Sequence, residues 1–275
     1  MRAIARVCDV SFNTVAKILI DAGRACAAFH NEKVVGVKSK RVQCDEIWSF
    51  NYCKAATLNR AKAAPKGAGD AWTWTAIDAD SKLILSWLVG GRDSSTANEF
   101  MQDVCDRLAN RVQITTDGLG LYLNAVDEAF GTDVDYSMLV KLYGETPEAE
   151  KRYSPAKCIG IKKKEIVGRP AAKDVSTSFV EAHNRTMRMS MRRFTRLTNA
   201  HSKKLENHCH ALALYFVWYN FARQHATLRV SPAMAAGLTK NLMSMEDIVA
   251  LTDAHERKFA TAIKRTLVTP LPYSK

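Results

Sequence analysis

The sequence lacks several patterns that define whole classes of proteins. No apolar run reaches the roughly 18 residues that a membrane-spanning helix needs, and the first residues lack the pattern of a secretory signal peptide. No C-x-x-C motif occurs, and the cysteines are seven, an odd number, scattered along the chain. This usage predicts free thiols in a reducing compartment and no structural zinc. Glycine and proline are also scarce, with 13 and 7 residues, which excludes a collagen-like or low-complexity chain.

Negative charge is in short supply as well. The 275 residues include 40 Lys and Arg but 28 Asp and Glu, which gives a net charge of +12. A basic balance of this size favours a polyanionic partner, and we expect DNA rather than a membrane surface. The apolar share of 47% is that of a globular protein, long enough for one large domain or two modest ones.

The most distinctive stretch, residues 176–199, has the periodicity of an amphipathic helix. Apolar residues gather on one face, and Glu181 heads a row of arginines on another. The row consists of Arg185, Arg188, Arg192 and Arg196. Ser178 and Glu181 have the S-x-x-E spacing of a capping box. Such a face is either solvated, with Glu181 pairing with Arg185, or a surface that binds phosphate.

Residues 1–29 predict a helix-turn-helix segment. Two short helices are separated by a break at residues 8–10, and Ser11 can cap the second. The second helix displays Asn13, Thr14 and Lys17 near its start, where the recognition helix of this motif contacts the DNA major groove. A small helical hairpin of any other kind is the alternative. No helix precedes the pair to brace it, so we expect a reading frame that lacks its beginning.

The middle of the chain predicts an α/β fold. The expected elements are a strand at 42–50, a hairpin with strands at 72–78 and 83–89, a helix at 95–110, a strand at 112–118, a helix at 121–130 and a strand at 134–142. Residues 144–173 read as a basic loop around Lys162–Lys164, and helices follow at 203–223 and 244–259. This order predicts a ribonuclease-H-like fold, a mixed five-stranded sheet with flanking helices.

The same patterns predict four parts of the chain. They are a helix-turn-helix segment at 1–29, a linker at 30–41, a ribonuclease-H-like catalytic domain at 42–240, and a C-terminal helix with a basic tail at 241–275.

Three carboxylates fall where this sheet order would gather them. Asp45 lies in the first strand, Asp117 ends the fourth, and Glu181 is on the helix expected to pack against them. Carboxylates converging from separate elements suit Mg²⁺ or Mn²⁺, and two such ions can clamp an in-line phosphoryl transfer. The chain has 28 acids, so many other sets of three are possible. Asp78 and Glu165 are the alternative members of this set.

Four segments resemble the DDE transposases of bacterial insertion sequences, most closely the insertion-sequence-one family. They are VQCDEIWSF, ITTDGLGLY, SFVEAHNRTMRMSMRRFTRLTNAHSKK and YNFARQHATLRVSPAMAAGLT. The resemblance implies that Asp45, Asp117 and Glu181 are catalytic and bind two Mg²⁺ ions. It implies an enzyme that cuts DNA at the ends of its element and joins the freed 3′-hydroxyl to target DNA, without a covalent enzyme–DNA bond. Related proteins often carry a cysteine-rich zinc-binding segment ahead of the helix-turn-helix, and here none precedes it.

The partners implied are double-stranded DNA, as element ends and as target, and further copies of the chain on that DNA. A cytoplasmic, nucleoid-associated location in bacteria follows. The expected DNA contacts come from the helix-turn-helix and from the arginine row. Two alternatives remain open: an inactive or regulatory transposase derivative that binds DNA through the helix-turn-helix, and a nuclease or integrase of the same fold.

Overall fold

The computed structural model describes residues 1–144, 158–195 and 198–268, with side chains as far as Lys258. Two compact units divide the chain. One is Val34–Lys204, and the other combines Met1–Lys33 with Leu205–Lys275. Within the described residues, no helix is long and apolar enough to cross a membrane.

This division differs from the predicted boundaries at residues 29, 41 and 240. Helix α2 (Phe12–Lys33) continues past residue 29 and packs against α6 (Leu205–Val217), so both ends of the chain form one unit. Only 34–40 is left between α2 and the first strand, in place of the linker expected at 30–41.

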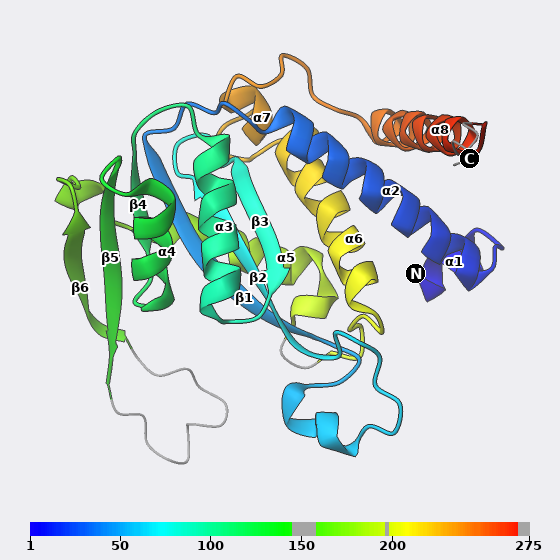
Figure 1. Ribbon diagram of the computed structural model, residues 1–275, viewed down its shortest axis with the longest axis horizontal. Helices are drawn as coiled ribbons and strands as arrows, with labels where there is room; N and C mark the ends of the chain where they lie inside the picture. The colour runs from blue at the N-terminus through cyan, green and yellow to red at the C-terminus, as the bar shows by residue number, and fades with distance from the viewer. Residues whose placement is uncertain (145–157, 196–197, 269–275) are drawn as a thin grey trace, which may run out of the picture. The chain divides into compact units, whose positions relative to one another are not determined.

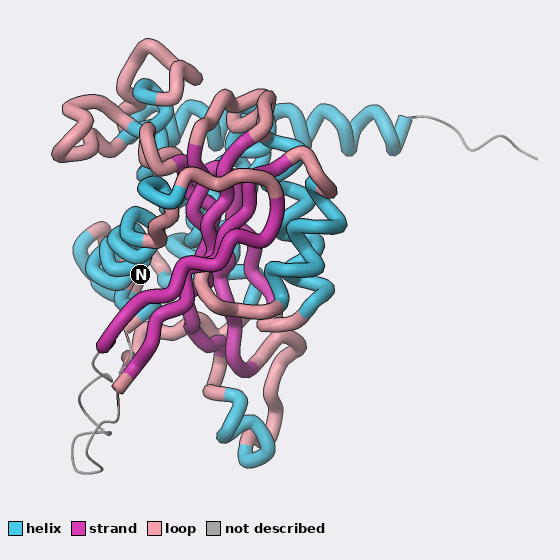
Figure 2. Tube along the Cα trace, turned by 90° about the vertical axis from the view of Figure 1, so that its left-hand side faces the viewer, coloured by secondary structure: helices cyan, strands magenta, loops and turns pink. Residues whose placement is uncertain are grey.

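A single mixed sheet forms the centre of the Val34–Lys204 unit. Its six strands in the described residues are β1 (Arg41–Asn51), β2 (Gly69–Asp78), β3 (Ile84–Gly90), β4 (Val112–Thr116), β5 (Val134–Tyr143) and β6 (Cys158–Val167). Their order is β3-β2-β1-β4-β5-β6, with β4 parallel to both neighbours and the other pairs antiparallel. Figure 2 shows the strands as one twisted sheet. With helices on both faces, this architecture is compatible with a ribonuclease-H-like fold.

The sixth strand, β6, corrects the predicted five-stranded sheet. Lys162–Lys164, expected in a loop, are paired with Val140, Leu139 and Met138 of β5. All three lysines are exposed, since β6 is the last strand of the sheet. A strand exposed on both faces has no reason to alternate apolar and polar residues, which is why its sequence did not read as a strand. The rest of the expected loop includes residues 145–157, which lie outside the described residues.

Helices cover both faces of this sheet. α3 (Ser94–Arg107) and α4 (Leu121–Phe130) lie against one face, and α5 (Ser178–Ser190) lies against the other (Figure 1). The α3/α4 side is packed around Trp74 of β2, whose ring is fully buried. Its centroid lies 5.3 Å from the ring of Tyr122 and 5.9 Å from that of Phe100.

The arginine helix is shorter than predicted. α5 ends at Ser190, Met191 is extended with φ −128° and ψ 100°, and a 3₁₀ turn follows at Arg192–Phe194. Arg192 is therefore off the helix, and Arg196 lies outside the described residues. Of the residues expected on its apolar face, Val180 and Met187 are buried on α5, Phe194 is buried on the 3₁₀ turn, and Met191 is half-buried.

The second unit is helical. It contains α1 (Arg2–Val7), α2, α6, a π-helical turn at Trp218–Ala222, α7 (Pro232–Ala235) and α8 (Met245–Val268). Helices α2 and α6 approach closely at Gly23, where a Cβ would lie 2.6 Å from Cα of His210. Phe29 of α2 packs edge-on against Phe221, with ring centroids 5.0 Å apart. Tyr215, Phe216, Tyr219 and Phe221 are buried and belong to the core of this unit.

The predicted helix-turn-helix is present only as two consecutive helices of very unequal length. α1 has six residues and buries none of them, whereas α2 has 22. Ser11 caps the second helix as expected, because the backbone N–H of Thr14 donates to its Oγ over 3.0 Å. The second helix is longer than predicted because it is also a core helix of this unit.

Candidate active site

Two residues on one face of β1 hold α5 in place. The side-chain Oε1 of Gln43 accepts hydrogen bonds from the backbone N–H groups of Phe179 (2.8 Å) and Val180 (3.2 Å), and so caps the start of the helix. Two residues further along the strand, Oδ2 of Asp45 accepts a hydrogen bond of 2.8 Å from Nδ2 of Asn184. Alternation along the strand puts both side chains on the α5 side of the sheet.

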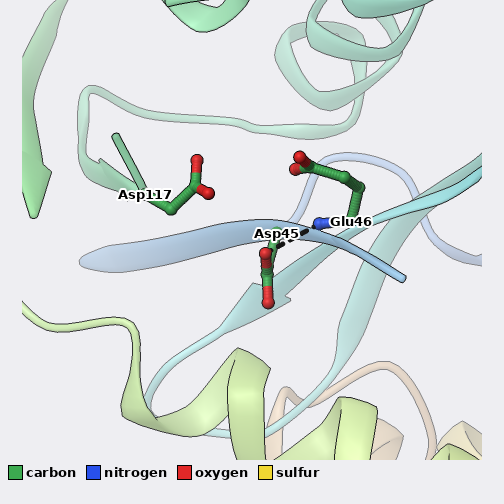
Figure 3. Close-up of side chains that lie close together, drawn as sticks. All are labelled: Asp45, Glu46 and Asp117. Atoms are coloured by element: carbon green, nitrogen blue, oxygen red, sulfur yellow. Dashed lines mark hydrogen bonds between the residues drawn. The ribbon is translucent and has the colours of Figure 1, made fainter. Parts of the chain in front are cut away.

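Asp45, Glu46 and Asp117 bring carboxylate oxygens within 4.8 Å of one another. Figure 3 shows Asp45 leaving β1 on one side, with Glu46 and Asp117 on the other. β4 pairs with β1 only as far as Gln43 and Thr115, and Asp117 follows just after β4 ends. Beyond that pair, β4 no longer runs beside β1. Acidic side chains from both faces of β1 can therefore approach Asp117.

The environment of Asp45 strongly shifts its pKa. Burial, followed by the charges of Glu46 and Asp117, raises its pKa to about 7. Its Oδ1 accepts a hydrogen bond of 2.9 Å from the backbone N–H of Glu46. Asp117 is held by its own loop, because the N–H of Leu119 donates to its Oδ1 over 2.9 Å.

Glu46 is a member of the cluster that sequence reasoning missed. Its side chain is 1% exposed, and Oε1 accepts hydrogen bonds from Nε (2.9 Å) and Nη2 (2.6 Å) of Arg92. The hydroxyl of Tyr122 donates to Oε2 over 3.2 Å, and the guanidinium of Arg92 lies 4.7 Å from the ring centre of Trp72. Burial raises the pKa of Glu46. Two consecutive acids inside an otherwise buried strand were the signal that could have identified it.

Glu181, the predicted third acid, is outside this group of oxygens. Its Oε2 lies 2.6 Å from Nζ of Lys141 on β5, and its Oε1 accepts a hydrogen bond from Thr177. Burial lowers the pKa of Lys141, but the hydrogen bond and charge of Glu181, together with the charges of Tyr143 and Asp45, leave that pKa raised. Glu181 still lies near the site, since its charge contributes to the raised pKa of Asp45.

The two alternative acids have other positions. Asp78 is buried at the end of β2, where Oδ1 accepts a hydrogen bond of 2.5 Å from Ser39 and Oδ2 one of 2.8 Å from the N–H of Ser81. It holds the turn between β2 and β3. Glu165 is exposed on β6. Neither carboxylate belongs to the group formed by Asp45, Glu46 and Asp117.

The cluster suits a hard divalent cation. Its donors are all carboxylate oxygens, the ligands that Mg²⁺ and Mn²⁺ prefer over the sulfur and nitrogen ligands favoured by zinc. Three carboxylates at this separation repel one another, and Arg92 offsets the charge of one of them. A bound cation would therefore reduce the repulsion among the three carboxylates.

The residues predicted to contact DNA are exposed, as far as they belong to the described residues. Arg185 and Arg188 are exposed on α5, and Arg192 is exposed just beyond it. Exposed near the start of α2 are Asn13, Thr14 and Lys17. Lys17 is also paired within its own unit, with Nζ 2.6 Å from Asp21 and 3.3 Å from Glu256.

Comparison with known proteins gives a limited result. No protein-family model matches this chain, and no curated protein sequence matches it. Among solved structures, a piggyBac transposase synaptic complex with hairpin DNA is similar, at 12% sequence identity and a TM-score of 0.34. The similarity covers 86% of this chain, which spans 59% of that chain's length. With this TM-score the similarity adds nothing to the assignment of a function.

Proposed function

We propose that this chain is a DDE-type transposase, which cleaves DNA at the ends of an insertion sequence and joins the freed 3′-hydroxyl to target DNA. The observation that carries the proposal is the approach of Asp45 and Asp117 at the end of β4, with Glu181 on the adjoining helix. The exposed arginines of α5 and the net charge of +12 support a DNA substrate.

Asp45 and Asp117 would hold the divalent cations, joined by Glu181 as the resemblance implies. When bound, such ions stabilise the charge on the attacking and departing oxygens of an in-line displacement. The hydrogen bonds from Asn184 and from the N–H of Glu46 fix both oxygens of Asp45 before any cation arrives. A carboxylate fixed in this way needs little rearrangement to act as a ligand.

The reaction consists of two displacements at phosphorus. In cleavage, a water oxygen bonds to phosphorus, the bond from phosphorus to the 3′-oxygen breaks, and a proton passes from the water to the departing 3′-oxygen. In joining, that 3′-hydroxyl oxygen attacks a target phosphorus and displaces a target 3′-oxygen, which takes up the proton. One phosphodiester replaces another in the second step, so no further energy source is needed.

Arg185 and Arg188 would hold the DNA backbone beside the acids. They lie three residues apart on α5, which places them about 4.5 Å apart along the helix axis. Guanidinium groups bind phosphate oxygens in pairs of hydrogen bonds, and so can orient the scissile strand. Arg192 and Arg196 are proposed to extend this contact, and Asn13, Thr14 and Lys17 to read the element ends.

The test is cleavage of a plasmid that carries the reading frame with its natural flanking DNA. Wild-type protein should nick the flanks in Mg²⁺ and not in EDTA. Asp45→Asn, Asp117→Asn and Glu181→Gln should each abolish nicking and joining while DNA binding persists. Because such residues act as a unit, double variants should be little worse than single ones. A variant with near wild-type nicking would remove that residue from the site.

A DNA-binding regulator without chemistry is the second candidate. The observation that favours it is the pairing of Glu181 with Lys141, which leaves the third acid outside the cluster. For this candidate, wild-type protein should give a footprint on the flanking DNA yet leave the plasmid intact at every Mg²⁺ and Mn²⁺ concentration. The same assay therefore separates the two functions.

A further inference from the structure

Asn184 has an unusual environment beside Asp45. The residue is 3% exposed, and its Nδ2 donates a hydrogen bond of 2.8 Å to Oδ2 of Asp45. The other end of the amide, Oδ1, is buried and has no hydrogen-bond partner among the described residues. A buried carbonyl oxygen without a donor has lost its hydration and gained no hydrogen bond in return, so its position calls for an explanation.

Reversing the amide does not remove the problem. The two ends of an amide have nearly the same shape, so the alternative orientation is sterically open. It would turn Oδ1 towards Oδ2 of Asp45 at the distance now held by Nδ2, 2.8 Å. Two acceptor oxygens at that separation repel unless a cation or proton lies between them. When Asp45 is ionised, an oxygen of Asn184 therefore lacks a positive partner in both orientations.

The surroundings indicate which partner would suit it. Hard divalent cations bind amide carbonyl oxygens together with carboxylates, and Asp45 already belongs to a group of three carboxylates. The acid of this helix, Glu181, is paired with Lys141 and accepts a hydrogen bond from Thr177. One turn further along α5, Asn184 is the residue in direct contact with Asp45.

We propose that Asn184 is an oxygen ligand of the divalent cation bound at Asp45 and Asp117, an inference that rests on the proposed metal-dependent function. In this role its carbonyl oxygen supplies a contact from α5 to the cation, in addition to the one proposed for Glu181. The helix is set for that role because Gln43 caps its start from β1, two residues from Asp45. Ligand and carboxylate are thus positioned by the same strand.

The experiment is calorimetric titration of the full chain with Mn²⁺ alone, comparing wild type with Asn184→Ala, Asn184→Asp and Asp45→Asn. Removing the amide in Asn184→Ala should weaken Mn²⁺ binding by roughly 10-fold or more. Asn184→Asp keeps an oxygen donor of the same size and adds a negative charge, so it should bind Mn²⁺ at least as tightly as wild type.

Asn184→Asp separates a ligand from a residue that only positions Asp45. Both substitutions delete the N–H that holds Asp45, so a positioning role alone predicts that both variants bind Mn²⁺ more weakly than wild type. That outcome would overturn the inference. Thermal unfolding gives a second readout. Without metal, Asn184→Asp should melt below wild type because two carboxylates then face each other, and Mn²⁺ should raise its melting temperature more than that of wild type.

Failure of this inference is distinct from failure of the proposed function. Wild-type binding that disappears in Asp45→Asn but is unchanged in Asn184→Ala overturns the role of Asn184 and leaves the metal site standing. Wild-type protein that binds no Mn²⁺, or binds it equally in Asp45→Asn, overturns both. If Asn184→Asp does not fold, Asn184→Ala still decides against the inference when its affinity equals that of wild type.

Discussion

Gln43 and Asp45, two residues apart on β1, both bond to α5 from the same face of the sheet. Oε1 of Gln43 lies 2.8 Å from the backbone N of Phe179, and Oδ2 of Asp45 lies 2.8 Å from Nδ2 of Asn184. Two contacts along one strand fix the start of the helix and its rotation together. The candidate site is therefore built on a strand and a helix, which hold side chains more rigidly than loops do.

The pH dependence of stability should follow the raised pKa of Asp45. This carboxyl loses its proton near pH 4 in the unfolded chain but at about 7 in the folded one, so the folded state binds more protons between these values. Stability without metal should therefore fall as pH rises from 4 to 7, by at most about 1.4 kcal/mol per pH unit. Urea unfolding in EDTA measures this, and Asp45→Asn should flatten the curve. Equal slopes in both proteins would contradict the assignment.

Arg92 should stabilise the folded state because it neutralises a buried acid. Arg92→Met leaves Glu46 without its cation, and we expect a loss of roughly 2–4 kcal/mol, below that for a fully buried pair because Arg92 is 41% exposed. The double variant Glu46→Gln, Arg92→Met should recover most of it.

Arg60→Met is the matched control for Arg92, since Arg60 is exposed on a 3₁₀ helix. It should change the free energy of unfolding by no more than about 0.5 kcal/mol. Chemical denaturation of the four proteins provides the values. A loss for Arg92→Met no larger than that of the control would show that Glu46 does not depend on it.

The exposed arginines of α5 should contribute to DNA affinity through phosphate. Arg185→Gln or Arg188→Gln should weaken binding to every DNA sequence and lower the slope of log K against log salt by about one unit. Arg111→Gln is the control, because Arg111 lies at the opposite end of β4 from Asp117 and pairs with Asp133 and Asp135. Fluorescence anisotropy across a salt series tests this. An unchanged slope in both α5 variants would mark the arginine face as merely solvated.

Gly23 should be essential to the contact between α2 and α6. A Cβ there would lie 2.4 Å from Cβ and 2.6 Å from Cα of His210, and backbone cannot move aside as a flexible side chain can. Gly23→Ala should cost about 1–3 kcal/mol through overpacking. Gly120→Ala is the comparison, because its added Cβ meets open space and its φ of −63° suits alanine. Equal stability of the two variants would rule out close packing at Gly23.

The sequence predicted the elements whose burial follows a simple period. β1 to β5 and α3 and α4 were expected close to their observed bounds, because each buries one face or is buried throughout. β6 escaped prediction because no face of it is buried. The end of α5 also escaped, since the arginine spacing continues past Met191 while the backbone there becomes extended.

The candidate site was predictable only in part, because it depends on tertiary packing as well as on the order of the strands. The order of strands brought Asp45 and Asp117 together, as expected from the sequence. Tertiary packing decides which other side chains join these two acids. The spacing of residues along the sequence does not predict that packing. Glu46 reaches the cluster from the opposite face of β1, and Glu181 is turned to Lys141, so neither position followed from periodicity.

The most direct measurement is anomalous diffraction from crystals of the wild-type chain soaked in Mn²⁺. We expect an anomalous peak within bonding distance, about 2.0–2.3 Å, of carboxylate oxygens of both Asp45 and Asp117, the range typical of a small hard cation. The same crystals of Asp117→Asn should lose that peak or show it much weakened. A wild-type map with no peak between the two aspartates at saturating Mn²⁺, or with the ion held elsewhere, would contradict the metal-dependent function.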